Sequence, residues 1–193
     1  MIRKIAWPSA IVLLACSAAG ASEIRRVVTG IDAGNKAIVL FDSQLTLKAP
    51  ASRPPSVNLW ITDSSPPGFS NADAAAKPIG LSPPDNGSVI RVVEFPPLDP
   101  AAEAKMDPEL LMKVVGDHAP ARGLPVKHPL MHRTRTVDYA VVLSGEIDMM
   151  LDDTTVHVKA GDVVIQQATN HAWINHGKEP CRVLFVLMDS KQP

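Results

Sequence analysis

Paired prolines divide the first half of the chain into short segments. Eleven of the 18 prolines fall between positions 50 and 100, and eight of these form four adjacent pairs. Proline lacks the backbone N–H that a central strand or a helix interior requires, so each pair marks a loop or a strand end. Short apolar, β-branched runs precede and separate the pairs, at residues 25–29, 36–41, 56–62 and 88–95. The pattern argues against a helix bundle and predicts ordered short strands rather than a disordered linker.

The second half of the chain reads as closely spaced strands. From Lys127 onward, apolar or alternating runs are separated by turn signals at Gly145, residues 152–153 and residues 160–162. Many short strands with frequent turns predict an all-β sandwich or barrel. One helix is expected before these strands, with Asp107 as N-cap, Pro108 at its first position and an end near Gly116.

These signals divide the chain into four parts. Residues 1–21 form a targeting segment, and residues 22–105 form a β-rich extension that packs on the barrel. Residues 106–126 hold the helix and a loop, and residues 127–193 form the core. Because an open sheet edge exposes unpaired backbone groups, we expect the extension to cover it, within one chain or across a homodimer.

The first 21 residues resemble a secretory signal. Arg3 and Lys4 precede an apolar stretch over residues 5–15, and Ala-Gly-Ala at residues 19–21 predicts cleavage before Ser22. An alternative is a lipid anchor at Cys16, because residues 13–16 resemble a bacterial lipobox. Both alternatives predict a periplasmic or secreted protein, the second as a lipoprotein. No later segment has the length needed to span a bilayer.

Charge and cysteine content exclude several classes of function. The 19 Lys and Arg residues against 20 Asp and Glu give a net charge of −1, so the chain lacks the basic field of a nucleic-acid-binding protein. Its two cysteines, Cys16 and Cys181, cannot build a thiolate zinc site or a disulfide framework. We expect Cys181 to be a small buried residue on a strand.

A polar strand face is the strongest indication of a functional site. In an extended segment, His132, Thr134, Thr136 and Asp138 point to the same side. Placing these groups inside a barrel costs hydration free energy, which a bound divalent cation would offset. Arg133 and Arg135 alternate with this set and should face outward.

Two segments of the second half resemble the motifs of the cupin superfamily. Residues 132–145 resemble the first motif, G(x)5HxH(x)3-4E(x)6G, and residues 161–175 resemble the second, G(x)4-5PxG(x)2H(x)3N. By position, His132 matches the first histidine, Asp138 the glutamate and His171 the histidine of the second motif. Thr134 stands where a further histidine is usual, and Gln166 or Gln167 replaces a proline. The resemblance covers residues 128–188 and implies a jelly-roll barrel.

The resemblance also implies a chemistry. A set made of His132, Asp138 and His171 would hold one divalent transition metal, Fe, Mn, Ni or Zn, with His128 or Gln166 as additional donors. The expected function is an exported metal-dependent enzyme acting on a small organic molecule, of the dioxygenase, decarboxylase or isomerase type. The alternative is a non-catalytic cupin that binds a small ligand or a protein partner, and a purely structural envelope protein is a third hypothesis.

Overall fold

The computed structural model describes residues 22–49, 53–107 and 127–191, and ten strands dominate this part of the chain. The predicted signal segment, and the predicted helix beyond Asp107, lie outside the described residues. The strands are β1 (Glu23–Ile31), β2 (Ala37–Thr46), β3 (Ser56–Thr62), β4 (Ser88–Phe95), β5 (Thr136–Ser144), β6 (Glu146–Met150), β7 (Thr155–Lys159), β8 (Val163–Gln167), β9 (Ala172–Ile174) and β10 (Cys181–Asp189).

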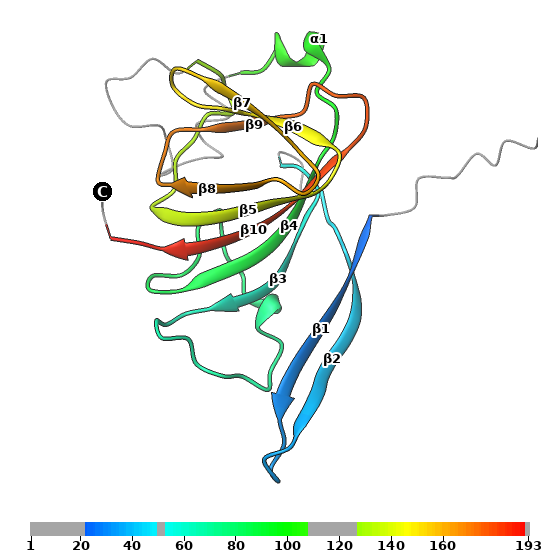
Figure 1. Cartoon of the computed structure of the whole chain (residues 1–193), viewed down its shortest axis with the longest axis vertical. Coiled ribbons are helices and arrows are strands. Elements are labelled where there is room, and N and C mark those ends of the chain that lie inside the picture. Colours follow the sequence, from blue (N-terminus) through cyan, green and yellow to red (C-terminus); the bar gives the residue numbers. More distant parts are fainter. Residues whose placement is uncertain (1–21, 50–52, 108–126, 192–193) are drawn as a thin grey trace, which may run out of the picture.

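The strands form three antiparallel sheets (Figure 1). A five-stranded sheet has the order β3-β4-β10-β5-β8, and a three-stranded sheet with the order β7-β6-β9 lies over part of it. Strands β1 and β2 form a separate hairpin. The predicted fold class, mostly β with one short helix before the motif-bearing strands, is confirmed. None of the described helices has the length and hydropathy needed to cross a bilayer.

The short helix begins at an Asp-Pro pair that precedes the one expected to start a helix at Asp107. Helix α1 (Pro100–Glu103) has Asp99 as its N-cap, and the Asp99 carboxylate accepts a hydrogen bond from the Ala101 N–H. Pro100 occupies the first helical position, where the missing N–H costs nothing. A 3-10 turn, η1 (Ala74–Ala76), is capped in the same way by Asp73.

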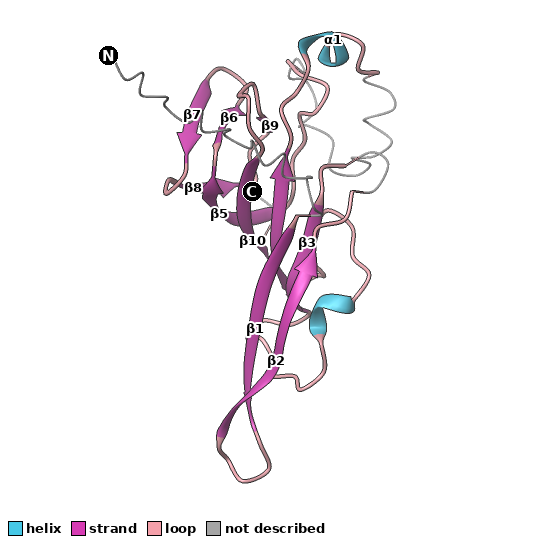
Figure 2. Cartoon of the chain, turned by 90° about the vertical axis from the view of Figure 1, so that its right-hand side faces the viewer, coloured by secondary structure: helices cyan, strands magenta, loops and turns pink. Residues whose placement is uncertain are grey.

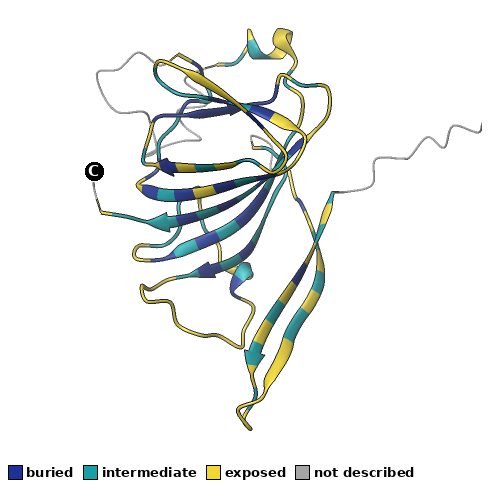
Figure 3. Cartoon of the chain, viewed as in Figure 1, coloured by how far each residue is buried: buried dark blue, intermediate teal, exposed yellow. Residues whose placement is uncertain are grey.

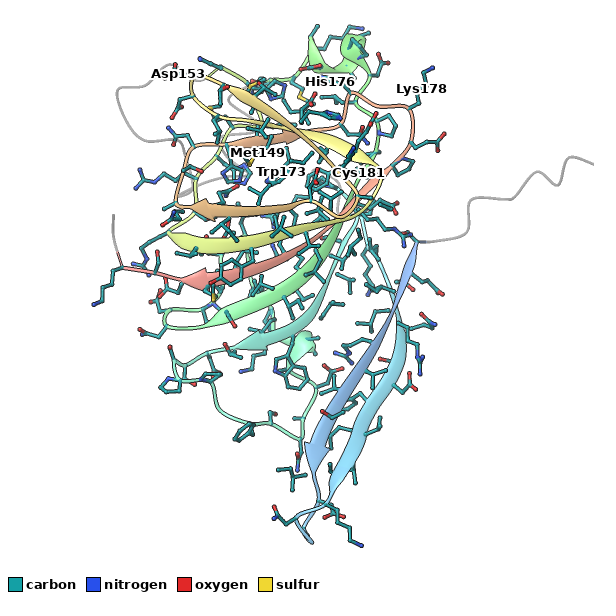
Figure 4. All side chains as sticks on the ribbon, in the orientation of Figure 1. Met149, Asp153, Trp173, His176, Lys178 and Cys181 are labelled. Carbon is teal, nitrogen blue, oxygen red and sulfur yellow. The ribbon has the colours of Figure 1, made fainter. Side chains whose placement is uncertain are left out.

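The core lies between the two larger sheets and follows from alternation along the strands. On β10, Cys181, Val183, Phe185 and Leu187 are buried, while the intervening residues are partly exposed. The three-stranded sheet contributes Ile147, Met149, Val158 and Trp173 to the same cluster (Figure 4). Burial raises the pKa of the Cys181 thiol to about 11, and this side chain is the buried apolar residue that its sequence context predicted.

The β1–β2 hairpin projects away from the sandwich (Figure 2). Near its base, Leu47 packs with Leu59 and Val92 on the outer face of the five-stranded sheet. The buried Arg26 anchors it by donating to both carboxylate oxygens of Asp73, at 2.7 and 2.6 Å, and to the Leu59 carbonyl. Beyond this anchor the hairpin is largely exposed (Figure 3), including apolar side chains such as Val39.

Candidate functional site

A cavity of about 640 Å³ opens on the inner face of the five-stranded sheet. Its apolar wall includes Phe95, Trp173 and Phe185, whose ring centroids lie 5.6–6.5 Å from one another. Aromatic rings at these distances pack as tilted or edge-to-face pairs. The cavity has the size and the apolar character of a site for a small organic molecule.

The structure brings His132, Thr134, Asp138 and His171 together in the wall of this cavity. His132 lies just before β5 and His171 just before β9. Their backbones form an isolated antiparallel bridge in which each N–H donates to the other residue's carbonyl at 2.9 Å. The two imidazole ring centroids are 4.3 Å apart.

Both imidazoles are oriented by backbone carbonyls two residues earlier. His132 Nδ1 lies 2.9 Å from the Leu130 oxygen, and His171 Nδ1 lies 2.9 Å from the Thr169 oxygen. A carbonyl only accepts hydrogen bonds, so each Nδ1 carries the hydrogen. In the neutral imidazole the lone pair is then on Nε2, as in most metal-bound histidines whose Nδ1 is held by a carbonyl.

Gln166 lies between the carboxylate and one of the imidazoles. Its Nε2 donates to Asp138 Oδ2 at 3.1 Å and approaches His171 Nε2 at 3.2 Å, so one amide group contacts two acceptors. Asp138 Oδ1 and Gln166 Oε1 are both buried without a hydrogen-bond partner. Burial raises the pKa of Asp138 to about 6, opposed by a hydrogen bond from Thr136. Burial and the nearby His132 lower the pKa of His171 to about 3, which keeps this imidazole neutral.

The donor types suit a divalent transition metal, but the side chains do not converge on one point. Across the described residues, no three His, Cys, Asp or Glu side chains come close enough to hold an ion as they stand. Thr134, which takes the place of a further histidine, shares a hydrogen bond with the Thr136 hydroxyl at 2.7 Å. The fit to a metal therefore rests on donor chemistry, with two imidazoles and an orphaned carboxylate oxygen lining one cavity.

The other described histidines lie elsewhere. His128 Nδ1 accepts from the Leu130 N–H, and its Nε2 contacts Glu103 of α1 at 2.8 Å, so both nitrogens are engaged outside the cavity. The exposed His157 and His176 each contact a carboxylate oxygen of Asp148, at 2.8 and 3.2 Å. The structure thus places His128 away from the predicted ligand set. His118 lies outside the described residues.

Two arginines that were not among the predicted site residues also line the cavity wall. These are Arg91 on β4 and the exposed Arg53. The sequence contains one indication that Arg91 faces inward. Arg91 alternates with Val89 and Val93, so all three side chains lie on the same face of the strand. A charged residue at such a position is rare without a partner or a function.

Comparisons with known proteins point to one family. Residues 124–187 match the family model described as "Cupin domain". "Phomopsin biosynthesis cluster protein C'" of Diaporthe leptostromiformis is 45% identical over 69 residues, which cover 35% of this chain and 36% of that protein. "Cupin-domain-containing oxidoreductase fogC" of Aspergillus ruber is 44% identical over 68 residues, 33% of each chain. "Cupin-domain-containing oxidoreductase srdD" of Neurospora crassa is 28% identical over 141 residues, 69% of this chain and 58% of that protein.

The matched region is short relative to the relatives. The chain spans about a third of the length of the curated relatives that it first matches. Among solved structures, a putative ethanolamine utilization protein Q from Salmonella typhimurium aligns with a TM-score of 0.44 and 10% identity, over 88% of this chain and 99% of that one. A Cupin 2 conserved barrel domain protein from Salinispora arenicola aligns with a TM-score of 0.39 and 11% identity, over 75% and 82%.

Proposed function

We propose that this chain, which contains a cupin domain, is a metal-dependent enzyme that acts on a small organic molecule in the cavity of that domain. One observation carries the proposal. His132 and His171 are held by backbone carbonyls in the tautomer that leaves the lone pair on Nε2, and they share the cavity wall with the orphaned Oδ1 of Asp138.

The relatives indicate the kind of reaction. Two of the similar fungal proteins are named cupin-domain-containing oxidoreductases, which favours an oxidation among the dioxygenase, decarboxylase and isomerase reactions that the sequence left open. A bound Fe, Mn, Ni or Zn ion would supply Lewis-acid polarisation of a substrate oxygen or, for Fe and Mn, redox chemistry.

The protein's own residues have separate tasks in this proposal. The aromatic wall excludes bulk water and holds the apolar part of the substrate. Burial raises the pKa of Asp138 to about 6 without a metal, and a bound cation would favour the ionised carboxylate that acts as its ligand. Gln166 bridges the Asp138 carboxylate and the His171 imidazole by donating to both, and it must give up these bonds when both groups bind one ion.

Metal titration tests the proposal. Isothermal calorimetry with Fe(II), Mn(II), Ni(II) and Zn(II), under anaerobic neutral conditions, should show one bound ion per chain. His132→Ala and His171→Ala should abolish binding, and Asp138→Ala should weaken it at least tenfold. His157→Ala is the matched control, because His157 is exposed and contacts Asp148 outside the cavity. Binding that is absent, or that survives in both cavity variants, overturns the metal-dependent function.

A second candidate function follows from Gln166. Because its amide already satisfies Asp138 Oδ2 and His171 Nε2, the polar cluster is largely paired without an ion. This favours the alternative of a non-catalytic cupin that binds a small ligand. That alternative predicts small-molecule binding in the cavity that is insensitive to chelators.

A further inference from the structure

Arg91 is a buried cation on the inner face of the five-stranded sheet. Only 9% of the residue is exposed, and its neighbours on the same face of β4 are apolar side chains of the core. Its Nε donates to Asn58 Oδ1 at 2.8 Å, and its two terminal nitrogens donate to the Leu81 and Gly80 carbonyls at 3.2 and 3.0 Å. All three acceptors are neutral, so they fix the guanidinium in place without balancing its charge.

The charge of Arg91 is not compensated within the described part of the chain. Arg91 forms no ion pair with any described carboxylate, in contrast to Arg26, which is equally buried and is paired with Asp73. Burial, and then the positive charge of Arg53, lower the pKa of Arg91 to about 10. Burying a charge without an opposite charge beside it is costly, and an anionic ligand would offset this cost.

Both guanidinium groups belong to the cavity described above. Arg53 and Arg91 line the same cavity as Asp138, His132 and His171. In the sheet register, Arg91 lies opposite Phe185, which lies opposite Ala140, two residues along β5 from Asp138. With strands about 4.8 Å apart and a rise of about 3.4 Å per residue, the Cα atoms of Arg91 and Asp138 are separated by roughly 12 Å.

Positive and negative side chains therefore lie at different positions in the cavity wall. Two cations stand in one part, the Asp138 carboxylate and two imidazoles stand in another, and Phe185 lies between them in the register. A ligand with one anionic end and an apolar body would be drawn to the arginines and repelled from Asp138. Arginine is suited to this task, since its planar fork of N–H groups matches both oxygens of a carboxylate.

We propose that Arg91 and Arg53 form a carboxylate-binding subsite, and that the substrate or ligand of the cavity is an apolar organic acid. Its carboxylate pairs with the guanidinium groups, and its body lies along the aromatic wall toward His132, Asp138 and His171. This inference rests on the cavity being the ligand site, as proposed above, but it does not require a metal.

Matched acids and amides test the subsite in the full chain. Binding of 4-phenylbutyrate and octanoate is compared with binding of 4-phenylbutyramide and octanamide by ligand-observed NMR and thermal shift at neutral pH. The acids should bind at least tenfold more tightly than their amides. Arg53→Ala should reduce this preference several-fold, and Arg91→Met should remove it. Arg25→Ala is the control, because Arg25 is exposed on the hairpin and paired with Asp42.

The outcomes separate this inference from the metal-dependent function. Equal binding of acids and amides, no binding of either acid, or an unchanged preference in Arg53→Ala overturns the subsite. If Arg91→Met does not fold, Arg53→Ala decides alone, since the Arg53 side chain is exposed and its loss removes no core contact. Arginine-dependent binding of acids in a protein that binds no metal would support the subsite and overturn the metal-dependent function.

Discussion

The backbones of His132 and His171 hydrogen-bond to each other in both directions, and their imidazole rings lie 4.3 Å apart between centroids. The bridge joins the segment before β5 to the segment before β9, so it ties the five-stranded sheet to the three-stranded sheet. The spacing of the two imidazoles is thus set by the backbone, and side-chain substitutions around them should change ligand binding more than they change this geometry.

Replacing Gln166 should make the protein less stable and more responsive to metal. Gln166→Met leaves Asp138 Oδ2 and His171 Nε2 without their shared donor, at a cost of about 1–3 kcal/mol in the free energy of unfolding. Saturating Zn(II) or Mn(II) should recover part of this loss, since an ion would take both freed acceptors. Urea unfolding with and without metal measures both effects, and Gln167→Met, at an exposed neighbouring position, is the control. Equal metal stabilisation of Gln166→Met and the unmodified chain would contradict the prediction.

Removing the counter-ion of Arg26 should loosen the hairpin. In Asp73→Ala the buried guanidinium keeps only the Leu59 carbonyl and Ser43 as polar partners, and η1 loses its cap. We expect a loss of about 1–3 kcal/mol, because Asp73 itself is partly exposed and water replaces part of its contribution. Chemical unfolding and proteolysis within β1–β2 report the change. Asp42→Ala is the control. It breaks the exposed ion pair with Arg25, the residue before Arg26, and should leave the melting temperature unchanged.

The same pair predicts an acid-sensitive stability. The hydrogen bonds from Arg26 lower the pKa of Asp73 below the ordinary aspartate value of 3.8, so the folded state favours the ionised carboxylate. Stability from this pair is fully present above the unfolded-state pKa and is lost as pH falls through the lower folded-state pKa. The denaturant concentration at the unfolding midpoint, measured from pH 7 to pH 2, should decrease once the pH is below about 4. Asp73→Asn should show a smaller fall, and an identical acid dependence in both proteins would count against the pair.

Gly87 should not tolerate a side chain. A Cβ at this position would overlap the carbonyl oxygen of Thr62, because the loop before β4 passes directly against the end of β3. Gly87→Ala should therefore cost about 1–3 kcal/mol through backbone displacement. Gly68→Ala, where nothing lies within 4 Å of the added methyl group, should stay within about 0.5 kcal/mol of the unmodified chain. The melting temperatures of the two variants, measured by thermal unfolding, test this prediction.

The mature N-terminus is predicted to be Ser22. Ser22 Oγ donates to Glu94 Oε2 at 2.7 Å and accepts from Arg182, so the first mature residue would be held by the sheet. Mass spectrometry of protein from the native host should show residues 1–21 removed. A lipidated Cys16 would instead identify a lipoprotein, and an intact Met1 would exclude both forms of processing.

Alternation along the strands made much of this structure predictable. The runs expected at residues 56–62 and 88–95 are β3 and β4, and the burial of Thr134, Thr136 and Asp138 follows the predicted inward face. β9 was missed because Ala172–Ile174 is three residues long and buried throughout, so it carries no alternating signal. α1 was missed because four residues cannot display helical periodicity, although its Asp-Pro start has the form expected at Asp107.

Contacts between residues that are far apart in the sequence could not be predicted from the pattern of residues along the chain. Nothing local indicates that His132 pairs with His171 or that Gln166 contacts Asp138, because these pairings bring together segments that are far apart in the sequence, 28 residues in the case of Gln166 and Asp138. The charge of Arg91 is visible in the sequence, but its lack of a counter-ion becomes evident only when every described neighbour has been placed. Strand periodicity therefore predicts which face a residue occupies, and tertiary structure determines its partners.

The position of β10 constrains how the chain can be made. This strand follows all the other described strands in sequence, yet it lies in the middle of the five-stranded sheet, between β4 and β5 (Figure 1). A ribosome must therefore synthesise the chain through Asp189 before the two halves of the sheet can join, and until then their inner edges stay unpaired. Until β10 has been made, the unpaired backbone groups of β4 and β5 at this position can pair with strands of other chains.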